Sequence, residues 1–269
     1  MSDLIPMSDV INGLAPAGEG FSLTVPPGWG QGRSAFGGLT AALAVNAMRQ
    51  KLGADERPLR SLLVSFVAPV LLGEKADIEA NLLRAGKSVI QAEARLVSGG
   101  GVAAVAQAAF GDARPTKGSS PLAAFTPEER DSVPAAPFVK GLFPDFLENF
   151  EIRWTGGGIP SSGSNSTRIG MWVRFRNPVD EALATERLIA IADMPPPAML
   201  SHYRERKTAS SLTWSLDFLV DPREVTGEWF YLDFSLDAAD GGYCQQTGRI
   251  FTEDGRLVMI GHQVMVYFE

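Results

Sequence analysis

Two stretches of this chain follow the same plan, and this repetition limits the possible folds more than any other feature of the sequence. The apolar run LLVSFVAP begins at Leu62 and is followed by three further strand-like runs, the last ending at Phe110. The run WSLDFLVDP begins at Trp214 and is likewise followed by three more, the last ending at Phe268. All eight runs are rich in β-branched and aromatic residues, and Gly or Asp residues separate them. The pattern predicts two meanders of four strands each.

A helical segment precedes each meander. The first, over residues 37–53, is rich in Ala and Leu and has almost no charge, so most of its surface must be buried. The second, over residues 179–197, has acidic residues in its first turn and three prolines that end it. One helix followed by an antiparallel meander, twice in one chain, predicts an α+β fold in which two antiparallel sheets each wrap around a central helix.

Prolines mark the connection between the two halves. Six of the 18 prolines fall within residues 111–146. Because proline interrupts helices and inner strands, we expect an ordered or semi-rigid connector there. The predicted organisation is a first unit over residues 1–112, a linker over residues 113–147 and a second unit over residues 148–269.

The composition excludes several classes of function. Hydrophobic residues make up 45% of the chain and charged residues 20%, as in a globular protein. The net charge of −7 argues against nucleic acid or an anionic membrane as the main partner. With Cys244 as the single cysteine and His202 and His262 as the only histidines, we expect no disulfide, no metal site and no cofactor.

Targeting signals are also missing from the sequence pattern. The first ten residues, MSDLIPMSDV, lack the basic start and apolar core of a signal peptide. No apolar run approaches the 18 or so residues that a membrane-spanning helix needs. We therefore expect a soluble, cytoplasmic protein without a membrane partner.

Short motifs in both halves resemble the TesB-type acyl-CoA thioesterases. AFGGLTAALA, at residues 35–44, is similar to the start of the family's first helix, and SLLVSFVAP to the strand after it. In the second half, IAIADMPPP, SLTWSLDF and EDGRLVMIGHQ are similar to the family's catalytic segments. The resemblance implies a double hot-dog fold, acyl-CoA as the substrate, and association of the chain into homodimers or tetramers.

The same resemblance implies which residues act on the thioester. The family's catalytic aspartate falls on Asp193 and its catalytic glutamine on Gln263. Its catalytic threonine falls on Ser211, which keeps the hydroxyl but loses the methyl group that restricts its rotamers. All three lie in the second unit. The implied reaction is hydrolysis of fatty acyl-CoA to the free acid and CoA by a water molecule that Asp193 activates.

The residues themselves agree with these roles. At a helix C-terminus with apolar neighbours, the pKa of Asp193 should rise toward the range of a general base. Regular alternation places Ser211 on the same strand face as Asp217, which is a reserve acid. The backbone N–H groups of Gly37 and Gly38 open the first helix and are candidates to stabilise an oxyanion.

Each of these features also has a structural interpretation. An exposed aspartate at a fraying helix end, a solvated strand face and close helix–sheet packing at the glycines produce the same patterns. A buried amide such as that of Gln263 often satisfies nearby backbone. Aligning the halves places Gln107 on Gln263, but only Asn46 is polar near the middle of the first helix. We therefore expect one active site per chain.

Other functions remain open on the sequence. A non-catalytic acyl or lipid carrier would keep the pocket without the chemistry. A hot-dog hydratase acting on enoyl-CoA would pair an acid with a histidine, but neither His202 nor His262 stands at a convincing spacing from Asp193. The apolar helix residues Leu39 and Val45, together with Leu43, line either an acyl tunnel or only the core.

Overall fold

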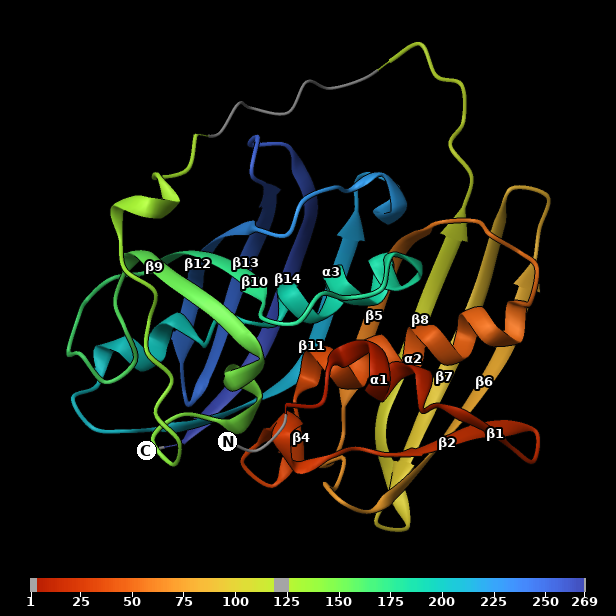
Figure 1. Ribbon diagram of the computed structural model, residues 1–269, viewed down its shortest axis with the longest axis horizontal. Helices are drawn as coiled ribbons and strands as arrows, with labels where there is room; N and C mark the ends of the chain where they lie inside the picture. The colour runs from red at the N-terminus through yellow and green to blue at the C-terminus, as the bar shows by residue number, and fades with distance from the viewer. Residues whose placement is uncertain (1–3, 119–125, 269) are drawn as a thin grey trace.

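A twelve-stranded antiparallel sheet dominates the computed structural model, which describes residues 4–118 and 126–268 (Figure 1). The strand order is β1-β2-β6-β7-β8-β5-β11-β14-β13-β12-β10-β9. A separate two-stranded ribbon pairs β3 (Gly30–Gln31) with β4 (Ser34–Ala35). Within the described ranges, no helix is long and apolar enough to cross a membrane.

The first half is built around one buried helix. Its elements are α1 (Met7–Asn12), β1 (Ala15–Ala17), β2 (Gly20–Thr24), α2 (Gly37–Leu52), β5 (Leu59–Phe66), β6 (Lys75–Ala85), β7 (Val89–Ser98) and β8 (Gly101–Gly111). Every residue of α2 from Gly38 to Met48 is buried, which confirms the burial expected of an almost uncharged helix. Leu39, Leu43 and Val45 belong to the main hydrophobic core.

The second half repeats this plan. Its elements are β9 (Phe150–Gly157), β10 (Arg168–Phe175), α3 (Ala184–Ala192), β11 (Thr208–Phe218), β12 (Phe230–Asp240), β13 (Tyr243–Thr252) and β14 (Leu257–Phe268). The helix is shorter than the predicted segment 179–197, because a 3-10 turn, Glu181–Leu183, precedes it. The four predicted strands of each meander are confirmed, whereas β1, β2, β9 and β10 add to the prediction.

The two halves join through a central strand pair. β5 pairs antiparallel with β11, with Val64 opposite Trp214 and Leu62 opposite Leu216. The two predicted sheets are therefore two halves of one continuous sheet, with α2 packed against α3 on its inner side. The predicted double hot-dog fold is confirmed, and the pairing of β5 with β11 adds to the prediction.

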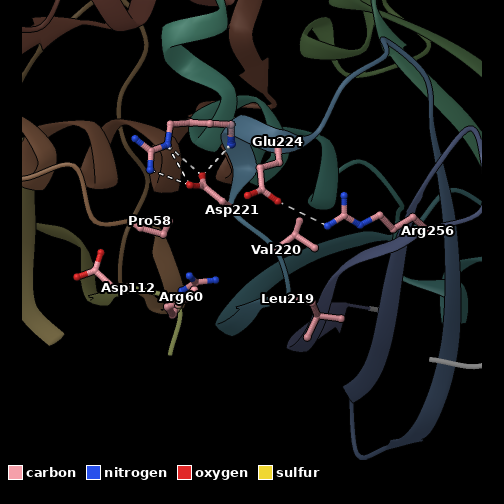
Figure 2. A pocket seen from close by; sticks show the side chains of 10 residues that line it. Pro58, Arg60, Asp112, Leu219, Val220, Asp221, Glu224 and Arg256 are labelled. Atoms are coloured by element: carbon pink, nitrogen blue, oxygen red, sulfur yellow. Dashed lines mark hydrogen bonds and ion pairs between the residues drawn. The ribbon is translucent and has the colours of Figure 1, made fainter. Parts of the chain in front are cut away.

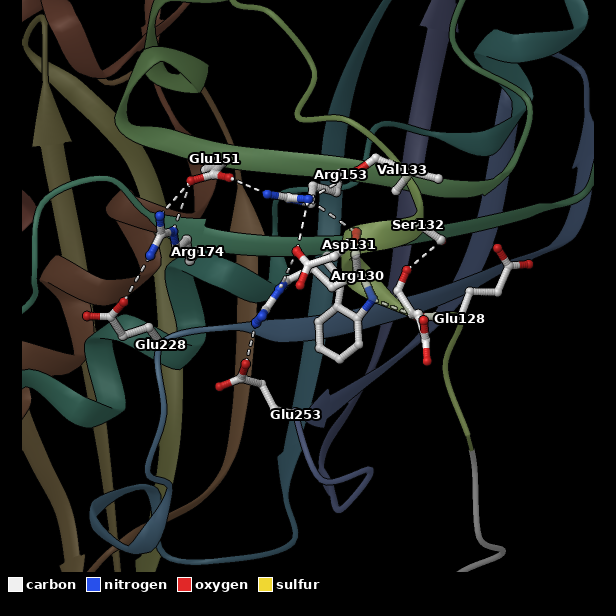
Figure 3. A network of polar contacts seen from close by, with 12 residues as sticks. Glu128, Arg130, Asp131, Ser132, Val133, Glu151, Arg153, Arg174, Glu228 and Glu253 are labelled. Atoms are coloured by element: carbon white, nitrogen blue, oxygen red, sulfur yellow. Dashed lines mark hydrogen bonds and ion pairs between the residues drawn. The ribbon is translucent and has the colours of Figure 1, made fainter.

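The connector is fastened to the second half by polar contacts (Figure 3). The Trp172 indole N–H donates to the backbone oxygen of Glu128 at 2.8 Å, and Arg153 forms an ion pair with Asp131 at 3.1 Å. Around the Trp229 ring, three guanidinium groups lie 4.9 to 5.6 Å from the ring centroid; they belong to Arg130, Arg153 and Arg174. Neighbouring carboxylates neutralise these guanidinium groups. The cation–π contacts and ion pairs together hold residues 128–133 against the sheet.

Candidate active site

The three side chains predicted to act together are in hydrogen-bond contact. Gln263 Nε2 donates to Asp193 Oδ1 at 3.0 Å and to Ser211 Oγ at 2.7 Å. Asp193 follows α3, Gln263 lies on β14 and Ser211 on β11. Both amide hydrogens of Gln263 are thus used in holding the acid and the hydroxyl. Ser211 accepts in its bond, so it keeps its own hydrogen to donate.

A β-bulge decides which way Ser211 faces. Regular alternation would put Ser211 beside Asp217, on the face opposite Trp214. The register between β11 and β14 shifts between Ser211 and Thr213, and the additional residue turns Ser211 to the inner face, where it meets Gln263. Asp217 stays exposed on the outer face. The prediction that Asp217 shares the face of Ser211 and serves as a reserve acid is therefore wrong.

The two glutamines aligned by the repeat point in opposite directions. Gln263 is only 4% exposed and faces the core, while its neighbour His262 is exposed on the outer face, as predicted. Gln107 is exposed, and its cross-strand partners are Leu63 of β5 and Glu93 of β7. Because a shift of one residue moves a side chain to the other face of a strand, Gln107 is not the counterpart of Gln263.

Asp193 has the electrostatic character of a general base. Burial of its carboxyl group raises the pKa from the ordinary value of 3.8 to about 7, against the opposing effect of hydrogen bonds from Gln263 and from the backbone N–H of Gly38. The residue as a whole is half-buried. At neutral pH a large fraction of this group is ionised and able to take a proton from water.

The N-terminus of α2 approaches the acid through its two glycines. A Cβ atom at Gly37 would lie 2.7 Å from Asp193 Oδ2, and one at Gly38 would lie 2.8 Å from the Phe36 ring. The Gly38 N–H, predicted to stabilise an oxyanion, instead donates to Asp193. The Gly37 N–H belongs to the first helical turn, where it has no acceptor within the helix, and it stays a candidate for the oxyanion.

One hollow of about 320 Å³ lies away from these residues (Figure 2). It is lined by residues at the start of β5 and just beyond the end of β11, including Arg60 and Leu219. Ser211 lies seven residues before the end of β11, which corresponds to about 23 Å along a strand. Charged side chains at the hollow pair with one another, as in the Arg223–Asp221 contact of 2.7 Å. The hollow is therefore separate from the candidate active site.

One buried polar residue beside the site was not predicted. Gln246 on β13 is fully buried and lies directly opposite Gln263 in the β13–β14 pairing. The burial pattern of β13 alternates from Tyr243 to Ile250, with Cys244, Gln246 and Gly248 on the inner face. This alternation in the sequence indicates a buried side chain at position 246, but none of the family-like motifs includes Gln246.

Comparisons with known proteins agree with this geometry. Residues 25–111 match the family described as the acyl-CoA thioesterase N-terminal domain, and residues 127–267 match the acyl-CoA thioesterase C-terminal domain. No curated protein matches the sequence.

Solved structures share the whole fold. A protein of unknown function with a hot-dog fold from Alicyclobacillus acidocaldarius has a TM-score of 0.85 and 21% identity, with 98% of each chain covered. An acyl-CoA thioesterase II, TesB2, from Mycobacterium marinum has a TM-score of 0.76 and 21% identity, covering 97% of this chain and 98% of that one. A tesB protein of Mycobacterium avium subs paratuberculosis has a TM-score of 0.75 and 20% identity, covering 98% and 100%.

At these identities the structural likeness shows the fold alone, and the family matches go further. They cover both halves and include the segments that bring Asp193, Ser211 and Gln263 together. The chain therefore belongs to the acyl-CoA thioesterase family and is a thioester hydrolase with the double hot-dog fold.

Proposed function

We propose that the chain hydrolyses fatty acyl-CoA by a single water molecule that Asp193 activates. The observation that supports this most is the hydrogen-bonded set of Asp193, Gln263 and Ser211, in which the pKa of the acid lies at about 7. Asp193 takes a proton from the water as the water oxygen bonds to the thioester carbon. The carbon–sulfur bond then breaks, and the CoA thiolate leaves and receives the proton from Asp193.

Gln263 and Ser211 position the water in this proposal. The two N–H bonds of Gln263 fix the carboxylate and the hydroxyl relative to each other, and its amide oxygen is left to accept from the water. A thioester carbonyl is electrophilic and a thiolate leaves readily, so an oriented water and a moderate base suffice without a covalent intermediate. The Gly37 N–H is the proposed oxyanion donor of α2.

A hydrolysis screen over short, medium and long acyl-CoAs tests the proposal. The wild-type protein should release CoA from at least one chain length, and Asp193→Ala should lower kcat by about 10²–10⁴-fold because general-base catalysis is lost. Asp217→Ala, which removes an exposed acid on the outer face, is the matched control and should leave kcat unchanged. Unchanged turnover in folded Asp193→Ala would contradict the mechanism.

The contacts of the two histidines favour hydrolysis over hydration of enoyl-CoA. His202 Nε2 lies 3.0 Å from the backbone oxygen of Ser166, and His262 is exposed on the outer face. Neither position pairs a histidine with Asp193 as hydratase chemistry requires. A carrier role would be supported by tight binding of acyl-CoA that is recovered intact after long incubation.

We also propose that the chain forms a homo-oligomer in the cytoplasm. Three exposed apolar residues near the β6–β7 turn support self-association: Leu82, Leu83 and Val89, which are 48%, 51% and 36% exposed. A single cysteine suits a reducing compartment. Light scattering should give the mass of a dimer or tetramer, and cell fractionation should recover the protein with the cytoplasm. A monomer mass at micromolar concentration would contradict the assembly.

A further inference from the structure

A second glutamine lies beside the candidate active site. Gln246 on β13 is 0% exposed and stands directly opposite Gln263 on β14. Opposite residues in an antiparallel pair have Cβ atoms about 4.5–5.5 Å apart. Three adjacent strands, β11, β14 and β13, therefore contribute Ser211, Gln263 and Gln246 to the same inner face.

The orientation of the Gln246 amide is fixed by the backbone. Its oxygen Oε1 accepts from the N–H of Ala198 at 3.1 Å. Because a backbone N–H only donates, the oxygen must face Ala198 and the nitrogen must face elsewhere. That nitrogen, Nε2, is buried and has no hydrogen-bond partner among the described residues. Ala198 lies five residues after Asp193, so Gln246 also fixes the chain that follows the acid.

A buried N–H group without an acceptor is rare in folded proteins. It loses its hydrogen bonds to water on folding and gains nothing in return. An acceptor that is not part of the chain removes this cost when it binds. An oxygen atom from a ligand would satisfy Gln246 Nε2 in this way.

Three N–H hydrogens of the site are already engaged, and the Gly37 N–H and the Ser211 hydroxyl are left. Gln263 uses both amide hydrogens on Asp193 and Ser211, and the Gly38 N–H donates to Asp193. Thioester hydrolysis places negative charge on the carbonyl oxygen, which needs N–H donors in a site that excludes water. Gln246 offers two amide hydrogens next to this set.

We propose that Gln246 is a substrate-binding residue whose Nε2 donates to an oxygen of the bound acyl group. The inference rests on the proposed acyl-CoA hydrolysis. Two oxygens have the required chemistry: the thioester carbonyl oxygen, and a hydroxyl or oxo oxygen on carbon 3 of the acyl chain. Either one lies within a few bonds of the reacting carbon.

Gln246→Met tests this contact, because it removes the amide while keeping a long, uncharged side chain. The control is Gln245→Met on the opposite face of the same strand. Each is assayed with a saturated acyl-CoA and a 3-hydroxyacyl-CoA of equal length. If the thioester oxygen is bound, kcat falls about 10²–10³-fold for both substrates while KM changes less. If the chain oxygen is bound, kcat/KM falls at least about tenfold for the 3-hydroxy substrate alone.

Gln246→Glu separates binding from a structural role. It keeps an oxygen for the Ala198 N–H, so the fold has its original acceptor. When protonated, the introduced carboxyl donates through its O–H, and when ionised it does not donate. We expect the affected constant, kcat for both substrates or kcat/KM for the 3-hydroxy substrate, to exceed that of Gln246→Met at pH 6 and to match it by pH 9. If Gln246→Met fails to fold, the ratio of Gln246→Glu to wild type in kcat and in kcat/KM decides, and one of the two should fall between the same two pH values.

The outcomes separate this inference from the proposed function. Folded Gln246 variants with kcat and KM within about threefold of wild type for both substrates, or a pH-independent ratio for Gln246→Glu, overturn it and leave a structural amide. An equal loss in Gln245→Met also overturns it. A wild-type protein that hydrolyses no acyl-CoA overturns the proposed function instead. Loss of activity in Asp193→Ala with active Gln246 variants overturns this inference alone.

Discussion

The two halves of the molecule have the same architecture but different chemistry at equivalent places. Each meander begins with a β-bulge, between Leu59 and Ser61 in the first half and between Ser211 and Thr213 in the second. Leu59 therefore stands where the second half has Ser211. Three residues further along, each strand pairs with the last strand of its own meander. The partner of Leu62 is Ala108, whereas the partner of Trp214 is Gln263.

Two carboxyl groups of the second half, one on α3 and one directly after it, differ in their hydrogen-bond and ion-pair partners. Glu186 of α3 is fully buried, but it pairs with Arg49 at 2.9 Å and accepts from Asn46 at 3.0 Å, both on α2. Asp193 has amide and backbone donors, and burial raises its pKa. The comparison shows that a cationic partner makes one carboxylate a structural ion pair. Without such a partner, the other is suited to accept a proton.

The largest difference is expected between the two carboxyl groups. Asp193→Asn should lower kcat by about 10²–10⁴-fold, because the base is removed, while Glu186→Gln should keep kcat within a few-fold. Stability should move the other way. Glu186→Gln loses an ion pair and should lower the free energy of unfolding by about 1–3 kcal/mol. Steady-state kinetics and urea denaturation of both variants check this, and inactive but folded Glu186→Gln would break the comparison.

Replacing second-half polar residues by their first-half counterparts should have the next largest effect. Gln263→Ala introduces the residue found at position 108 and releases both Asp193 and Ser211. Misplacement of the reacting groups should lower kcat about 10²-fold. Gln107→Ala, at the exposed glutamine of β8, is the control and should be silent in the same assay. Equal losses in the two variants would contradict the assignment of the site to one half.

The pH dependence should be dominated by Asp193. Because the proposed base must be ionised, kcat should fall about tenfold per pH unit below its pKa of about 7 and level off above it. The folded pKa lies above the ordinary 3.8, so the folded protein binds more protons between these values. The contribution of this group to stability is therefore full below pH 4 and is lost as pH rises to 7.

Asp193→Asn provides the check on this dependence. The wild-type protein should lose a few kcal/mol of its free energy of unfolding between pH 4 and pH 7, and Asp193→Asn should not. Urea denaturation at the two pH values measures this. A kcat of the wild type that is flat from pH 5 to pH 8 would show that a different group acts as the base.

The smallest effect is expected at the hydroxyl. Ser211→Ala removes one hydrogen-bond partner of Gln263 and should lower kcat about tenfold or less. Ser211→Thr keeps the hydroxyl and should retain wild-type kcat within a few-fold. Ser215→Ala, on the outer side of the same strand, is the control. If Ser211→Ala matches Ser215→Ala in kcat, the hydroxyl takes no part in placing the water.

Local patterns predicted much of this molecule. The almost uncharged composition of residues 37–53 predicted a buried helix, and the repeated apolar runs predicted eight strands. Both predictions succeed because helices and strands depend on patterns in consecutive residues. The motifs around Asp193 and Gln263 likewise predicted two side chains that meet. The pairing of β5 with β11 depends on contacts far apart in sequence, and no local pattern shows it.

The errors arise from insertions of single residues. An alternating pattern assumes an unbroken strand. The strand β11 was predicted correctly, but the bulge before Thr213 moves Ser211 to the face opposite the predicted one. The alignment of Gln107 with Gln263 allowed gaps in the turns, and that freedom shifted the comparison to the other face of β8. The alternation along β13 indicates that Gln246 is buried, but its contacts with Ala198 and Gln263 come from other elements and leave no local pattern.

The bond from Gly38 to Asp193 crosses from one half of the molecule to the other. The helix α2 of the first half has no acidic residue, yet its start contributes a hydrogen bond to the proposed base of the second half. A chain cut within the connector would yield two fragments, each exposing a long bare strand edge along β5 or β11. Neither fragment would retain turnover alone, and activity would return only when the two pieces reassociate.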